Sequence, residues 1–103
     1  MKTIYVRHDG KASASLLTDP SGDKTAILTE VAVWPEFRGR GWGSEILKEV
    51  CADADTDDVT LMLSFDPGPN GLSAEAMLSW YERYGFIRAL NDPDVMIRLP
   101  QGR

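Results

Sequence analysis

The segment from Arg38 to Ser44 contains the residue types that bind phosphate. Glycines alternate with larger residues there, at positions 39, 41 and 43, and Arg38 and Arg40 lie among them. Glycine permits backbone angles that other residues avoid, and it lets the main chain approach a ligand closely. A helix is predicted to begin at once after these glycines, so its first amides and the positive end of its dipole point to one place. Hydrogen bonds to a charged group contribute about 1.5–3 kcal/mol each, so several together can hold a diphosphate.

Two other nucleotide-binding patterns do not fit this segment. The spacing is Gly-x-Gly-x-Gly, whereas a dinucleotide site has Gly-x-Gly-x-x-Gly and an acidic residue on a later strand. The Gly-Lys-Ser/Thr of a Walker loop does not occur in the sequence. A turn and helix start with fortuitous glycines is the remaining alternative, and the two arginines argue against it.

The hydrophobic pattern predicts strands and helices that position this segment. We expect strands near 4–6, 12–17, 25–34, 59–65, 86–90 and 95–99, and helices over 41–55 and 73–84. Pro35 ends the third strand and Gly85 ends the second helix. The expected fold is α/β, a mixed sheet of order β-β-β-α-β-α-β-β with two packed helices. Asp9-Gly10 predicts a two-residue hairpin, and the aspartates at 53, 55, 57 and 58 are interpreted as a solvated loop.

Two motifs of this sequence together resemble the GCN5-related N-acetyltransferases, the GNAT family. The family's coenzyme motif, Arg/Gln-x-x-Gly-x-Gly/Ala after a strand, is matched by Arg38, Gly41 and Gly43. Its second motif, an aromatic-Tyr-Glu-x-x-Gly-Phe helix end, is matched by residues 80–86, Trp-Tyr-Glu-Arg-Tyr-Gly-Phe. The resemblance covers residues 25–86 best, and the two motifs in the correct order are more specific than either alone.

The resemblance implies acetyl-coenzyme A as the co-substrate. The backbone of Val31 and Val33 would pair with the pantetheine arm, and an amide near Val31 or Ala32 would bind the thioester oxygen. Ser73 or Asn70 would replace a family asparagine whose position here is Ala74. The expected coenzyme-binding residues are Val31, Ala32, Val33, Arg38, Gly39, Arg40, Gly41, Trp42, Gly43, Ser44 and Ser73.

Tyr81 and Glu30 are the candidate catalytic residues. The family pattern implies that Tyr81 lies near the departing sulfur, and we expect it to donate a hydrogen bond to the thiolate. Glu30 is the first candidate for the general base, with Asp66 second. The alternatives are that Tyr81 packs in the core and that Glu30 is a solvated strand residue.

The rest of the sequence limits the other possibilities. The 103 residues are expected to form one domain over 1–103, and the net charge of −5 argues against nucleic-acid binding. We find no apolar run that predicts a membrane helix, no export signal and no residue spacing typical of a metal site. The single Cys51 fits a cytoplasmic protein and is interpreted as packing, as are Met77 and Trp80. His8 is expected to be exposed.

The predicted function is transfer of acetyl to a primary amine, such as a protein lysine, by direct attack in a ternary complex. The chain resembles a short form of the family, without the N-terminal strand and two helices that cover the acceptor pocket. An open acceptor site, or one completed by a homodimer or another partner, follows from this. The alternative is a non-catalytic module of this fold that binds coenzyme A or a partner protein.

Overall fold

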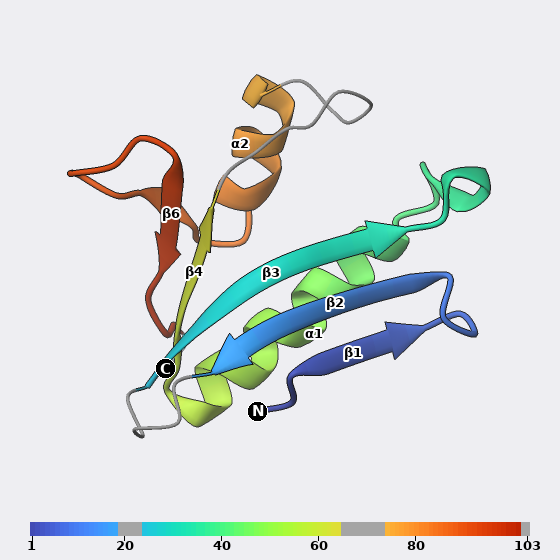
Figure 1. Ribbon diagram of the computed structural model, residues 1–103, viewed down its shortest axis with the longest axis horizontal. Coiled ribbons are helices and arrows are strands. Elements are labelled where there is room, and N and C mark those ends of the chain that lie inside the picture. Colours follow the sequence, from blue (N-terminus) through green and yellow to red (C-terminus); the bar gives the residue numbers. More distant parts are fainter. Residues whose placement is uncertain (19–23, 65–73, 102–103) are drawn as a thin grey trace.

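Six strands form one mixed sheet, with two helices packed on one side of it (Figure 1). The structure is a computed structural model that describes residues 1–18, 24–64 and 74–101. The strands are β1 (Ile4–Arg7), β2 (Ala12–Thr18), β3 (Thr25–Val33), β4 (Thr60–Ser64), β5 (Ile87–Arg88) and β6 (Val95–Arg98). The helices are α1 (Trp42–Asp57) and α2 (Ala74–Glu82), and a 3₁₀ turn at Pro35–Phe37 precedes α1. This order confirms the predicted fold class, although β5 is shorter than expected.

The sheet has the strand order β1-β2-β3-β4-β6-β5, and among the described strands only β3 and β4 pair in parallel. Their pairing starts at Thr25 opposite Thr60 and ends at Ile27 opposite Met62. Beyond that point β3 continues to Val33 beside β2 alone, while β4 continues beside β6. The two central strands therefore open like a fork (Figure 1).

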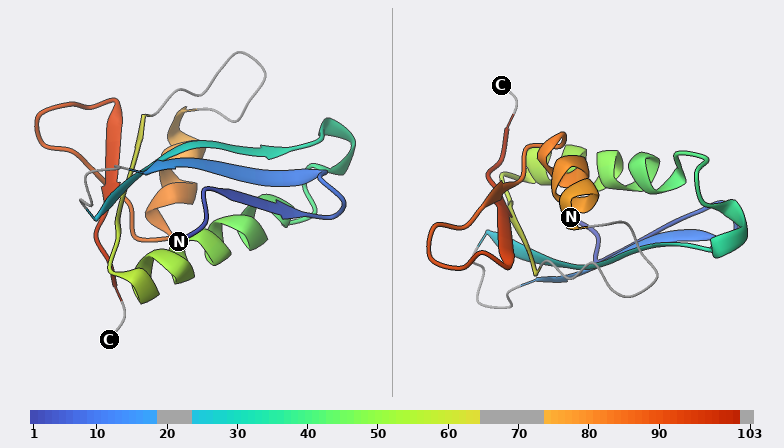
Figure 2. Two further views of the ribbon diagram at one scale, coloured as in Figure 1. Left: turned by 60° about the horizontal axis from the view of Figure 1, so that its bottom comes forward. Right: turned by 90° about the horizontal axis from the view of Figure 1, so that it is seen from above.

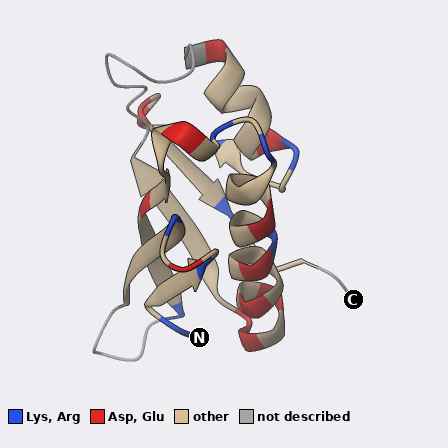
Figure 3. Ribbon diagram, turned by 90° about the vertical axis from the view of Figure 1, so that its right-hand side faces the viewer, with Lys and Arg blue, Asp and Glu red and all other residues tan. Residues whose placement is uncertain are grey.

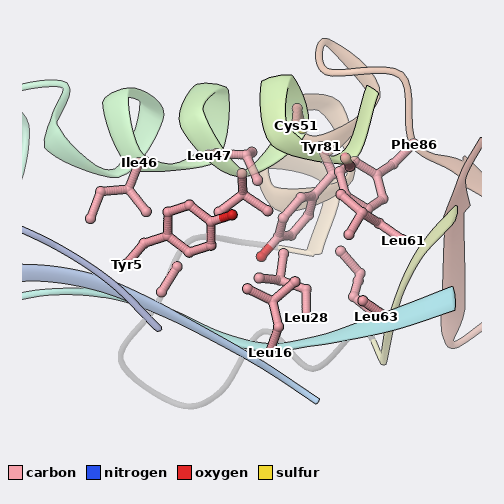
Figure 4. Packing of buried hydrophobic residues seen from close by; sticks show 14 of the residues in the cluster. Tyr5, Leu16, Leu28, Ile46, Leu47, Cys51, Leu61, Leu63, Tyr81 and Phe86 are labelled. Carbon is pink, nitrogen blue, oxygen red and sulfur yellow. The ribbon is translucent and has the colours of Figure 1, made fainter. Parts of the chain in front are cut away.

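The core lies between the sheet and the helices. Figure 2 shows α1 and α2 on the same side of the sheet. From α1, Ile46, Leu47 and Val50 are fully buried, as the helical spacing predicts. Large apolar side chains contribute about 1.5–3 kcal/mol each when they are buried. Figure 4 shows Ile46 and Leu47 beside Tyr5 and other buried side chains from the sheet and α2. None of the helices in the described ranges has the length and apolar character needed to span a membrane.

The turn between β1 and β2 differs from the predicted two-residue hairpin. Strand pairing ends at Arg7 opposite Ala12, so the turn has four residues, 8–11. His8, Asp9 and Gly10 all have positive φ, at 55°, 56° and 86°. Three consecutive left-handed residues form a wider turn than Asp9-Gly10 alone would make. This geometry brings His8 to the start of α1, as described below.

The interpretation of the aspartates at 53–58 as a solvated loop was wrong. The helix α1 continues to Asp57, and acidic residues recur along it (Figure 3). Asp53 accepts a hydrogen bond of 2.6 Å from the Tyr5 hydroxyl on β1. Asp55 accepts two hydrogen bonds, of 2.8 and 3.0 Å, from Arg98 on β6, whose side chain is buried. These partners lie more than 40 residues away along the chain, so local composition does not reveal them.

Replacing Asp55 by Asn tests this ion pair between a half-buried carboxylate and a buried guanidinium. The Arg98 guanidinium holds the pKa of the Asp55 carboxyl below its ordinary value, so the pair stabilises the fold above the ordinary carboxyl pKa and is lost as pH falls through the lowered one. Asp55→Asn should lower the free energy of unfolding at pH 7 by about 2–3 kcal/mol, because Arg98 stays buried without its counter-charge. Urea unfolding at several pH values measures this loss.

The difference between Asp55→Asn and the wild type should shrink as the pH falls through the lowered pKa of Asp55, because the carboxyl of the wild type then also becomes neutral. Asp58→Asn is the matched control, because Asp58 is exposed and forms no ion pair with any described residue. An equal loss of stability in both variants would contradict the role given to Asp55.

Candidate functional site

Two adjoining hollows occupy the fork between β3 and β4. The smaller hollow, of about 180 Å³, lies within the fork, and the larger, of about 760 Å³, continues along β3 to the start of α1. Glu30 and Val31 line both hollows. The smaller is lined further by Leu28, Thr29, Leu63, Ser64, Met77 and Tyr81. The larger is lined further by Ala32, Val33, Phe37, Arg38, Gly39, Gly41, Trp42, Gly43, Ser44 and Trp80.

A β-bulge at Thr29 and Glu30 sets which side chains of β3 face the helices. Glu30 pairs with Ser15, but the next pair along is Leu28 with Leu16, so β3 contains one extra residue. Leu28 is buried before the bulge, and Val31 packs against the same core after it. Strict alternation would have placed them on opposite faces. Because of the bulge, Thr29 and Glu30 are both exposed at the fork.

The backbone of Val31 and Val33 points into the fork. The Trp34 amide donates to the Lys11 carbonyl at 2.8 Å, which makes Trp34 and Lys11 a hydrogen-bonded pair. Because such pairs alternate along an antiparallel ladder, the backbone of Ala32 also bonds to β2. The N–H and C=O groups of Val31 and Val33 therefore face away from β2. The Arg38 side chain supports this direction, since its Nε donates to the Val33 carbonyl at 3.4 Å. Of the two amides considered from the sequence, only that of Val31 faces the fork.

The glycine loop leaves the first amides of α1 available to a ligand. Gly39 and Gly41 have φ of 84° and 80°, in the left-handed region that glycine adopts most easily. The first bond within α1 runs from the Glu45 amide to the Gly41 carbonyl at 3.0 Å, and no side chain caps the helix. The amides of residues 42–44 thus precede the helical ladder, at the positive end of its dipole. Residues 42–44 line the larger hollow.

Trp80 is part of this site, although the sequence indicated packing alone. Its indole Nε1 donates a hydrogen bond of 3.1 Å to the Ser44 hydroxyl. A Cβ on Gly43 would lie 3.7 Å from the Trp80 ring and 3.7 Å from Val33. Trp80 therefore connects α2 to the start of α1 and forms a wall of the larger hollow. Its position directly before Tyr81 in the helix-end motif was the available signal for this.

Tyr81 lies where the smaller hollow meets the core. Its side chain is 8% exposed, and its hydroxyl points towards the sheet (Figure 4). No described residue bonds to this hydroxyl, and Tyr81 lines the hollow. Burial raises the pKa of the Tyr81 hydroxyl above its ordinary value, so the group remains a neutral donor at neutral pH.

The other predicted site residues are only partly brought together. Glu30 and Tyr81 both line the smaller hollow, from β3 and α2 respectively. Arg40 does not line either hollow; its guanidinium lies 5.1 Å from the centre of the Phe37 ring. Ser73 and Asp66 lie outside the described residues, so their predicted roles stay predictions.

His8 supports the start of α1, which the sequence did not indicate. Its ring stacks on Trp42 with centroids 3.8 Å apart and planes 10° apart. Its Nε2 shares a hydrogen bond of 2.9 Å with Glu45. Phe37 also stacks on Trp42, with centroids 5.0 Å apart. The first residue of α1 is thus held between rings from the β1–β2 turn and the 3₁₀ turn.

Within residues 1–18, 24–64 and 74–101, no group of His, Cys, Asp or Glu side chains is arranged to hold a metal ion. Cys51 is buried on α1, as expected for a packing residue, and burial raises the pKa of its thiol to about 11. Such a thiol is a poor nucleophile at neutral pH.

Comparison with known proteins agrees with this geometry. The chain matches the acetyltransferase (GNAT) domain family over residues 2–88. No curated protein sequence matches it. Among solved structures, the anti-CRISPR protein AcrVA5 is similar with a TM-score of 0.72 and 15% identity, covering 93% of this chain and 98% of that one.

Two similar structures are larger enzymes of the same fold. The ribosomal-protein-S18-alanine N-acetyltransferase from Escherichia coli has a TM-score of 0.69 and 21% identity, and 90% of this chain covers 63% of that one. The PaiA N-acetyltransferase from Thermoplasma acidophilum, in complex with coenzyme A, has a TM-score of 0.64 and 16% identity. The similarity to the PaiA enzyme covers 85% of this chain and 52% of that enzyme. The chain thus spans less than two thirds of the length of either enzyme.

A forked sheet with a glycine loop before an uncapped helix, together with the match over residues 2–88, defines the class of protein. The chain belongs to the GNAT acetyltransferase domain family. This confirms the family that the motifs at residues 38–43 and 80–86 indicated.

Substitutions in the glycine loop test whether backbone conformation forms the site. Gly41→Ala should weaken coenzyme A binding about tenfold, because an alanine at φ 80° costs roughly 1–2 kcal/mol and the chain will relax away from this geometry. Gly43→Ala is the matched control, because Gly43 has no positive φ and its added Cβ meets only ordinary contacts. Isothermal titration calorimetry measures both affinities. Equal loss in the two variants would show that side-chain space, and not backbone conformation, limits binding.

Proposed function

We propose that this protein transfers an acetyl group from acetyl-coenzyme A to a primary amine by direct attack in a ternary complex. The observation that supports this best is the alignment of two unsatisfied backbone segments along one groove. The fork-facing backbone of Val31 and Val33 leads directly to the free amides of residues 42–44. An extended amide-containing arm that ends in a diphosphate matches this order of groups.

Acetyl-coenzyme A would lie along β3 with its diphosphate at the glycine loop. The amides of residues 42–44 would donate to the phosphate oxygens, and Arg38 would add a charge-assisted bond after leaving the Val33 carbonyl. The pantetheine amides would pair with Val31 and Val33 as an added strand does. The thioester would then reach the smaller hollow, where the Val31 amide can donate to its carbonyl oxygen.

The chemical step requires a neutral amine and a stabilised leaving thiolate. An amine with a pKa near 10.4 must lose a proton at a cost of roughly 4.6 kcal/mol at pH 7. Glu30, exposed on the wall of the hollow, would accept this proton directly or through water. The amine nitrogen then attacks the thioester carbon and the carbon–sulfur bond breaks, while the Tyr81 hydroxyl donates a hydrogen bond to the departing thiolate. The nitrogen loses its second proton to solvent as the amide forms, and the thiolate takes up a proton from solvent after it leaves.

A protein lysine or another amine on a macromolecule is the acceptor class that we propose. Glu30 and Ser64 are exposed beside the smaller hollow, and no described helix covers the sheet face opposite α1 and α2. A large acceptor can therefore approach the fork, unless a second copy or a partner covers it. The Escherichia coli enzyme named above, whose name gives a ribosomal protein as its substrate, supports the view that this fold accepts such acceptors.

Tyr81→Phe and Glu30→Gln test the two catalytic roles. Loss of the Tyr81 donor should lower kcat by roughly 10- to 100-fold, with little change in coenzyme A affinity. Loss of Glu30 should lower kcat by about 10²- to 10⁴-fold, because the amine then lacks a proton acceptor in the site. Acetyl-coenzyme A turnover over a panel of amines and basic proteins, measured across pH, gives both results.

Tyr84→Phe and Glu82→Gln are the matched controls, because they make the same chemical changes near the end of α2 at residues that line neither hollow. Unchanged rates in both site variants would refute the assigned roles. Binding of acetyl-coenzyme A with no turnover on any acceptor would favour the alternative, a non-catalytic module of this fold.

A further inference from the structure

A row of apolar side chains crosses the sheet on the face opposite α1 and α2. Strand pairing places five such side chains next to one another, and we call them the apolar row: Leu17, Ile27, Met62, Ile97 and Ile87. Residues paired across neighbouring strands point to the same face of a sheet. Because adjacent strands lie about 4.8 Å apart, the apolar row continues for roughly 19 Å from β2 to β5.

The two helices leave this row uncovered. The neighbours of Ile27 along β3, Ala26 and Leu28, are buried in the core, so Ile27 points to the other face of the sheet. Leu17 and Ile87, at the two ends of the row, are 62% and 61% exposed, and Ile27 is 45% exposed. Figure 2 shows both helices on one side of the sheet, and no described helix lies on the other. In a single copy of the chain, the apolar row therefore faces solvent.

Exposed apolar side chains are concentrated on this face. Eight large apolar side chains of the described residues are exposed, and five of them point here. Three belong to the apolar row, and the other two are Ile4 and Val6 on β1, on either side of the buried Tyr5. Among the described strand residues that point to this face, only Glu30 is charged. A contiguous apolar surface of this kind is typical of a protein interaction site.

The distribution of charge favours a second copy of the chain as the occupant of this face. Carboxylates recur along α1, on the far side of the sheet from the apolar row (Figure 3). When two copies pack through the row, their α1 helices lie on the outer sides with two sheets between them, farther apart than the about 8 Å over which salt screens charges. The net charge of −5 therefore does not oppose this contact. A lipid surface is disfavoured, because membrane-binding faces are rich in lysine and arginine and the described strand residues of this face include neither.

The apolar row is also complementary to itself in shape and size. Its two ends have similar exposure, and Met62 lies at its middle. A twofold axis that passes beside Met62, in the plane between two facing sheets, lays one row over the other, so that apolar side chains meet apolar side chains. Strands of these lengths give a face of roughly 500 Å² in projection. The relief of its side chains brings its accessible area towards the about 800 Å² per partner that a stable interface buries.

We infer that two copies of this chain associate through the apolar row, sheet face against sheet face, as a twofold-symmetric dimer. Ile27 and Met62 lie at the centre of this interface, and Leu17 and Ile87 lie towards its ends. Because Glu30 follows Ile27 by three residues, about 10 Å along β3, the second copy also borders the approach to the smaller hollow. This inference goes beyond the proposed function, since the association requires no coenzyme.

Sedimentation equilibrium of the purified full chain, without coenzyme, tests this inference. The mass of the wild type should approach twice that of one chain as the concentration rises, with a Kd in the micromolar range, because the face is at the lower end of stable interface sizes. Leu17→Lys and Ile27→Lys should each weaken the association more than about tenfold, because each brings two like charges into the interface. Both side chains are exposed in a single copy, and thermal unfolding checks that each variant is folded.

Leu90→Lys is the matched control, because Leu90 is fully exposed but lies in the segment between β5 and β6, away from the apolar row. This variant should keep the wild-type Kd. A wild type that stays monomeric well above micromolar concentration would overturn the inference, whether or not another protein or a lipid vesicle binds the row. Unchanged association in both row variants would also overturn it, since the dimer would then use another surface. Neither result bears on the proposed function, which is tested by coenzyme binding and turnover.

Discussion

The early separation of β3 and β4 is the constraint on which the rest of the site depends. Parallel pairing ends at Ile27 and Met62. Beyond Ile27, β3 therefore has a neighbouring strand on one side only, although it lies in the middle of the strand order. Backbone groups at such an edge need hydrogen bonds from water or from a ligand, because a buried unsatisfied donor costs about 1–3 kcal/mol. At the fork these backbone groups stay accessible, because the space between β3 and β4 forms an open groove. In the function that we propose, an extended ligand in this groove would complete the sheet, which gives a physical reason why a long, amide-containing coenzyme suits it.

The bulge at Thr29 and Glu30 determines which side chains of β3 face the core and which are exposed at the fork. It keeps Leu28 and Val31 on the core face while both bulged residues are exposed beside the hollow. Without the extra residue, one of the two apolar side chains would face solvent. Thr29 also holds the bulge against β2, since its hydroxyl donates to the Ser15 carbonyl at 2.9 Å. Buried core residues and exposed polar residues beside the hollow thus follow one another along a single strand.

The carboxylates along α1 attach the β1–β2 hairpin to this helix. Its carboxylates Glu45, Glu49 and Asp53 are spaced four residues apart and bind His8, Arg7 and Tyr5 respectively, all from the first hairpin. These contacts attach an edge strand to the helix. The cations left unpaired by the described carboxylates then include those at the glycine loop. The acidic helix therefore organises the hairpin, and the hairpin in turn supports Trp42 at the start of the same helix.

The sequence by itself determined the order of elements, the glycine loop and the family, because these depend on conformations set within a few residues. Glycines at positions 39 and 41, followed at once by an amphipathic helix, predict that the first amides of this helix have no partner within it. This prediction needs no knowledge of tertiary contacts. Tertiary structure decided the contacts between distant segments: the bulge on β3, the bond from Trp80 to Ser44, the pair of Asp55 with Arg98 and the stack of His8 on Trp42. Each depends on strand register and helix packing. Side-chain type and local spacing do not contain that information, since Ser44 and Trp80 are 36 residues apart and Asp55 and Arg98 are 43 apart.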